Sequence, residues 1–156
     1  MATGETAPKP EESLDLDPAA LAKAKPLFVY YYVDPVTDPM DSNYKFSRKF
    51  EMSVLCEEIV DLLNKNFVCK KVVLPADADM KLAKNQARIE IWSPTSKKVG
   101  LIGGTEENLL NKTPFLVFAR SRLAKSEKLV TDEITRIHQL RKEKEEAAKK
   151  ESASKD

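Results

Sequence analysis

The feature that most constrains the fold of this chain is a strand, a loop, a helix and a second strand in direct succession. Residues 27–33 are an apolar, aromatic run with the length and composition of a β-strand. An Asp-Pro pair at 34–35 ends this run, because proline cannot continue a central strand. Apolar residues then recur at helical spacing over 43–63, and 67–74 has the β-branched content of a second strand. This order predicts an α/β domain.

Size and charge limit the kind of protein this chain can be. Its 156 residues, 42% of them hydrophobic, suffice for one domain with tails. The 26 basic and 25 acidic side chains nearly cancel, so no overall field attracts nucleic acid or an anionic membrane. No apolar run approaches the roughly 20 residues that cross a bilayer, and the first residues do not form a secretory signal. We therefore expect a cytoplasmic protein with no membrane contact.

Several shorter elements are predicted around this centre. Residues 1–13 are polar and proline-rich and should be mobile, whereas Asp17 and Pro18 suit the start of a short helix. Another short helix is predicted from Asp77 or Asp79 through Gln86. Alternating residues in 88–92, a turn and a returning run in 97–102 predict a β-hairpin.

The C-terminal third is predicted to be helical. Residues 113–120 have strand-like composition, but Phe115, Ala119 and Leu123 lie four apart, so a helix is favoured over a strand. A further helical pattern runs from Glu127 and passes into a highly charged tail, in which glutamate and lysine at four-residue spacing favour a solvated helix.

Residues 46–68, and most specifically Phe50-Glu51 and 59–68, resemble the first helix and second strand of thioredoxin-like proteins. The resemblance implies an α/β fold with a central mixed sheet of about four strands flanked by helices over 26–125. A mobile tail with a short helix would precede it in 1–25. An amphipathic, then highly charged, C-terminal helix would follow in 126–156.

The chain departs from that family at its reactive corner. Thioredoxin-like proteins usually carry Cys-x-x-Cys where this chain has residues 34–44, which contain no cysteine. They also place a cis-proline before the third strand, where Asn-Gln-Ala-Arg stands at 85–88. The resemblance therefore implies a redox-inactive domain without a cofactor, acting as a protein-binding or scaffolding module, and the sequence favours a non-enzymatic role.

The loop at this corner is the first candidate binding site. An apolar contact from Met40 and Tyr44, rimmed by Asp34, Asp38 and Asp41, would form a binding edge. The alternative is a connector with two Asp-Pro turns and an Asn or Ser helix cap.

A second candidate surface is an apolar stripe of the C-terminal helix. It consists of Val130, Ile134, Ile137 and Leu140. The stripe could pair with a partner helix or a second copy of the chain, although two heptads are too few to define a coiled coil. Alternatively, it docks on its own domain.

Cysteine and histidine chemistry is the remaining enzymatic alternative. A single-cysteine thiol oxidoreductase would use Cys56, but Cys56 and Cys69 are both predicted to be core residues, since free cysteine is among the most buried types. His138 is predicted to be solvated. Two separated cysteines and one histidine match no zinc pattern, so no metal is expected.

Nucleic-acid binding is a third alternative. It would depend on basic residues that are interspersed with acids and lack an aromatic platform. These residues are Lys70, Lys71, Lys97, Lys98, Arg120 and Arg122.

Overall fold

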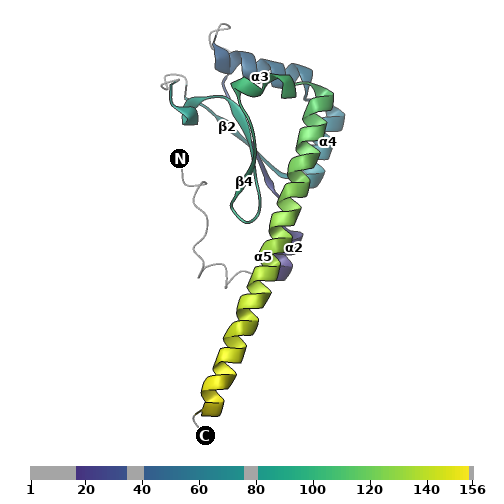
Figure 1. The fold of residues 1–156 in the computed structure, drawn as a ribbon. Coiled ribbons are helices and arrows are strands. Elements are labelled where there is room, and N and C mark those ends of the chain that lie inside the picture. Colours follow the sequence, from purple (N-terminus) through teal and green to yellow (C-terminus); the bar gives the residue numbers. More distant parts are fainter. Residues whose placement is uncertain (1–16, 35–40, 76–80, 155–156) are drawn as a thin grey trace.

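The computed structural model describes residues 17–34, 41–75 and 81–154 and has an α/β fold (Figure 1). A mixed four-stranded sheet is flanked by helices, and a long C-terminal helix extends to Ser154, as predicted. The elements are α2 (Pro18–Lys23), β1 (Leu27–Tyr32), α3 (Ser42–Ser53), α4 (Glu57–Asn66), β2 (Val68–Val73), η2 (Ala83–Asn85), β3 (Arg88–Trp92), β4 (Lys98–Ile102), η3 (Gly104–Leu109) and α5 (Lys112–Ser154).

The sheet has the strand order β2-β1-β3-β4. β1 pairs in parallel with β2 and antiparallel with β3, so Tyr30 lies between Lys71 and Ile89. β3 and β4 form the predicted hairpin. The two edge strands of the sheet are therefore β2 and β4, and β1 lies inside the sheet.

The main core lies between the sheet and helices α3, α4 and α5. Alternate side chains of β1 and β3, such as Phe28 and Ile91, pack there with Phe50 and Phe115. The Phe50 ring lies 4.7 Å from the Tyr30 ring and 5.6 Å from the Phe115 ring, between centroids. Aromatic contacts thus join α3, β1 and α5.

The helical pattern over 43–63 forms two helices instead of one. The backbone N–H of Leu55 donates to the carbonyl of Phe50, five residues earlier, and α4 begins only after Cys56. The break lets the buried residues Phe50, Val54 and Ile59 all reach the core, which a single straight helix would not achieve.

Helix α5 is continuous from Lys112 to Ser154, so the helix favoured for residues 113–120 is confirmed and joins the pattern that begins at Glu127. Its 43 residues correspond to about 65 Å of helix. Residues 141–153 are exposed on all sides, and this part of α5 extends away from the sheet (Figure 1). Among the described residues, no helix is long and apolar enough to cross a membrane.

Two shorter predictions have different outcomes. Asp17 caps α2 by accepting from the backbone N–H of Ala19 (3.0 Å), as predicted. The helix predicted through Gln86 is wrong in its described part, where only the 3-10 turn η2 forms; Asp77 and Asp79 lie outside the described residues. Residues 1–13 also lie outside them.

Candidate functional site

The corner between α3 and the segment before β3 is closed by the side chain of Asn43. Its Nδ2 donates to the carbonyl of Asn85 (2.8 Å), and its Oδ1 accepts from the backbone N–H of Ala87 (2.7 Å). Asn43 and Ala87 are both buried. The Asn43 side chain therefore forms hydrogen bonds with one backbone donor and one backbone acceptor. This corner adjoins the loop that was predicted as a binding site.

The described members of the predicted loop site are Asp34, Asp41 and Tyr44. Asp41 is the N-cap of α3 and accepts from the backbone N–H of Asn43 (2.8 Å), where the connector alternative expected an Asn or Ser cap. Tyr44 is half-buried against the core and accepts a hydrogen bond from Arg48 Nη1 (3.2 Å). Asp34 is exposed. Asp38 and Met40 lie outside the described residues.

The apolar stripe of α5 is in contact with the chain's own helix α2. Leu21 forms a small buried cluster with Val130 and Ile137, and Ile134 packs against it. Leu140, one helical turn further on, is half-buried and not part of this cluster. Most of the predicted partner surface is thus covered intramolecularly, which is the arrangement of the docked alternative.

Both cysteines are exposed, so their predicted burial is wrong. The break between α3 and α4 makes Cys56 the N-cap residue of α4, and Cys69 lies on the edge strand β2. Burial still raises the pKa of the Cys69 thiol, an effect that the charge of Lys25 partly offsets. The two cysteines do not form a disulfide with each other.

A buried carboxylate, which the sequence interpretation missed, lies on the sheet face opposite the main core. Glu90 is 4% exposed. It accepts from Arg88 Nε (2.9 Å) and Trp92 Nε1 (3.1 Å), and Lys98 Nζ lies 3.5 Å from its Oε2. Arg88 also stacks over the Tyr31 ring, with its guanidinium carbon 3.8 Å from the centroid. The i, i+2 spacing of 88, 90 and 92 in a strand was the available indication.

We expect Glu90 to stabilise the fold mainly above pH 4.5. Burial raises the pKa of Glu90, but the hydrogen bonds from Arg88 and Trp92 and the charges of Arg88 and Lys98 outweigh it, so the net pKa is lowered. The unfolded chain then binds the proton more tightly, and stability falls as pH drops below the ordinary value of 4.5. Glu90→Gln should lower the free energy of unfolding at pH 7 by about 1.5 to 3 kcal/mol.

The measurement is denaturant unfolding from pH 7 to pH 3 for both proteins. The difference between them should shrink below pH 4.5, because protonation removes the same charge from the parent chain. Glu145→Gln, which changes an exposed carboxylate in the charged part of α5, is the control. A difference that stays constant with pH would contradict the assignment.

Strand β2 presents an open edge. The backbone N–H groups of Val68 and of Leu74 donate to Pro26 (2.9 Å) and Tyr32 (2.7 Å), toward β1. Because successive residues of a strand direct their backbone groups to opposite sides, the N–H and C=O of Cys69, Lys71 and Val73 point away from β1. Within the described ranges no strand lies beyond β2. Val68 and Val73 are 53% and 58% exposed.

A small apolar cavity adjoins this edge, between β2 and α4. Its volume is about 160 Å³. Leu55, Val60 and Leu63 line it from the helical side and Cys69 from the strand, with Phe28 among the residues beneath. Val60 is 39% exposed, so the cavity opens to the surface. It is comparable in size to engineered apolar cavities of about 150 Å³ that hold benzene.

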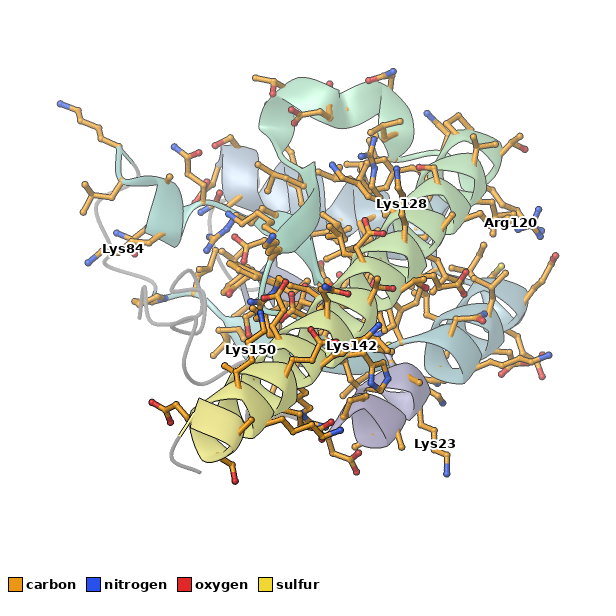
Figure 2. The ribbon with its side chains drawn as sticks, turned by 60° about the horizontal axis from the view of Figure 1, so that its bottom comes forward. Lys23, Lys84, Arg120, Lys128, Lys142 and Lys150 are labelled. Atoms are coloured by element: carbon orange, nitrogen blue, oxygen red, sulfur yellow. The ribbon has the colours of Figure 1, made fainter. Side chains whose placement is uncertain are left out.

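The basic residues considered for nucleic-acid binding do not converge. Lys70 and Lys71 lie on β2, whereas Lys98 lies on β4 at the other edge and pairs with Glu90. Arg122 extends along β4 and donates to the Val99 carbonyl (3.3 Å). Figure 2 shows further basic side chains dispersed over α2, η2 and the length of α5. Among the described residues, no group of three or more His, Cys, Asp or Glu side chains could hold a metal ion.

Comparison with known proteins gives no match of significance: no family model, curated protein or solved structure corresponds to this chain.

Proposed function

We propose that this chain is a redox-inactive, thioredoxin-like module that binds another protein and acts as a scaffold. The observation that carries the proposal is the open edge of β2 beside an apolar cavity. An exposed edge strand offers unpaired backbone groups to a second chain, and a neighbouring cavity gives that pairing specificity. In the cytoplasm, where we propose it acts, both exposed thiols would remain reduced.

Two further observations support the proposal. The strand order, with one parallel and two antiparallel pairings, is compatible with the thioredoxin-like resemblance. At the corner where that family carries its thiols and its peptide clamp, Asn43 already occupies the carbonyl of Asn85 and the N–H of Ala87. A substrate peptide would have to displace a buried side chain there.

Site-specific photo-crosslinking in the native host tests the binding role. A photoreactive residue at Val73 on β2 should give a discrete adduct with a protein partner. The matched control is Val117, which is 64% exposed on α5. Equal adducts from both positions, or none from Val73, would contradict binding at this edge.

A single-cysteine oxidoreductase using Cys56 is the second candidate function. The observation favouring it is that Cys56 is exposed as the N-cap residue of α4 and lies near Lys112. A helix N-terminus and a nearby cation both favour a thiolate. Glu58, whose Oε2 lies 2.8 Å from Lys112 Nζ, draws that cation into an ion pair.

Alkylation of the native protein separates the two functions. For a redox-inactive module, we expect Cys56 to react with iodoacetamide at pH 7 within about threefold of an unstructured cysteine peptide. Cys69 should react more slowly, because its raised pKa leaves less thiolate. Peptide-resolved mass spectrometry measures both rates. A Cys56 rate more than about a hundredfold above the peptide would favour the oxidoreductase.

A further inference from the structure

We infer that the partner of the β2 edge is an extended acidic segment of another protein, which adds to the sheet as a fifth strand and inserts one apolar side chain into the cavity beside α4. This inference rests on the proposed binding function and names the chemical class of its partner. Three independent features of the edge carry it: its backbone, its cavity and its charge.

The backbone of β2 fixes the form of the partner. Cys69, Lys71 and Val73 present outward N–H and C=O groups at alternate positions along the strand. A second strand lies about 4.8 Å away in a sheet and pairs with such a row of groups. A helix cannot satisfy them, because its own backbone groups are already bonded internally.

The register of β2 places its side chains on two faces. Cys69, Lys71 and Val73 are paired with Phe28, Tyr30 and Tyr32 of β1, so they share the face covered by α4, where the cavity opens. Lys70 shares the opposite face with Val29. Alternate side chains of an added strand would therefore approach the cavity on one face and Lys70 on the other.

The charge of the edge indicates an acidic partner. Lys70 and Lys71 lie on the strand, and Lys25 and Lys65 lie near its beginning. None of these four lysines forms an ion pair with a described residue; Lys71 Nζ lies 4.6 Å from the Tyr32 ring centroid. Asp61 and Glu57 of α4 are exposed but do not line the cavity. Carboxylates on one face of a partner strand would thus meet Lys70, and the other three lysines add positive charge around the same edge.

Lysines on an edge strand also have a simpler explanation, since they discourage pairing with unrelated chains. Protection alone does not account for the cavity, nor for Val60, Val68 and Val73, which leave apolar surface exposed beside the same edge. A strand that needs only protection gains nothing from a neighbouring pocket of side-chain size. Specific acceptance of one segment explains the lysines and the pocket together.

The test uses the full chain and a labelled synthetic peptide in which glutamate and leucine alternate, with binding followed by fluorescence anisotropy. Two control peptides carry lysine in place of glutamate, or proline at every second position. We expect the acidic peptide to bind at least about tenfold more tightly than either control, because only it combines charge with strand formation. Equal binding of the proline peptide would reduce the effect to charge attraction and overturn the proposal.

Variants of the chain probe each feature separately. Lys71→Pro removes an outward N–H without removing a bond to β1, and should weaken binding about tenfold relative to Lys71→Ala. Val60→Phe should fill the cavity and weaken binding to a similar extent, and Lys70→Glu should weaken it more than Lys97→Glu on the far hairpin. If Lys71→Pro fails to fold, the other two comparisons still decide. If neither Val60→Phe nor Lys70→Glu weakens binding as expected, the proposal is overturned.

Hydrogen exchange supplies a readout independent of affinity. In the free protein the amides of Lys70 and Val72 should exchange slowly and those of Cys69, Lys71 and Val73 quickly. Saturation with the acidic peptide should protect the second group specifically. Protection elsewhere, or a doubling of the protein's mass with no peptide bound, would assign the edge to another occupant and overturn the acidic-segment proposal.

The chain itself contains an acidic, leucine-bearing stretch at residues 11–17. A chain lacking residues 1–16 should bind the peptide with unchanged affinity if the partner is a separate protein. Tightening of about tenfold would identify the chain's own segment as the occupant and overturn the proposal. A protein crosslinked from Val73, together with equal binding of the acidic and control peptides, would support the binding function. It would overturn only the inference that the partner segment is acidic.

Discussion

Replacing Phe115 with alanine is expected to lower the free energy of unfolding by about 3 to 5 kcal/mol. Phe115 is 0% exposed, and its ring centroid lies 6.2 Å from Phe28 and 5.6 Å from Phe50. The substitution leaves a cavity where α5 meets the sheet and removes two aromatic contacts. Since small domains are stable by only about 5 to 15 kcal/mol, this loss is a large fraction of the total.

Chemical denaturation followed by circular dichroism and by the fluorescence of Trp92 measures the change. Val117→Ala on the same helix is the matched control, because Val117 is exposed and its truncation should cost less than about 0.5 kcal/mol. A Phe115→Ala protein as stable as this control would mean that α5 does not pack on the sheet as described.

Asn43→Ala is expected to lower the free energy of unfolding by about 2 to 4 kcal/mol. The substitution removes the acceptor of the buried Ala87 N–H and a donor to the Asn85 carbonyl. Neither group gains a new partner from alanine, and a buried polar group that loses its partner costs more than an average hydrogen bond contributes. The effect should centre on the segment before β3.

Thermal unfolding measures the loss, and hydrogen exchange at the Ala87 amide locates it. Lys45→Ala, an exposed position in the first turns of the same helix, controls for any change in helix propensity. If the Ala87 amide exchanges at the same rate in both variants, Asn43 does not close this corner.

The same substitution should leave the proposed binding function intact. A module that binds through β2 should keep its partner when Asn43 is replaced, because the corner and the edge strand are different sites. Comparing the Val73 crosslink in the parent chain and in the Asn43→Ala chain therefore adds a second test of the proposed site.

Local patterns in the sequence determined most of the elements. The apolar run of β1, the alternation in the hairpin and the Asp17 cap of α2 each depend on neighbours a few residues apart, and each is found. The helix over 113–120 was favoured against its composition because its apolar residues lie four apart. Such short-range features survive in any tertiary arrangement that buries one face.

Only the tertiary structure decided where the surface and the sites are. The bond between Asn43 and Ala87 joins residues 44 positions apart, and the break before Cys56 exists because α3 and α4 both pack on one sheet. The order of strands makes β2 an edge; its two lysines are compatible with that position but do not determine it. Burial of Glu90 and exposure of Cys69 likewise follow from packing between distant segments, which residue type and periodicity do not specify.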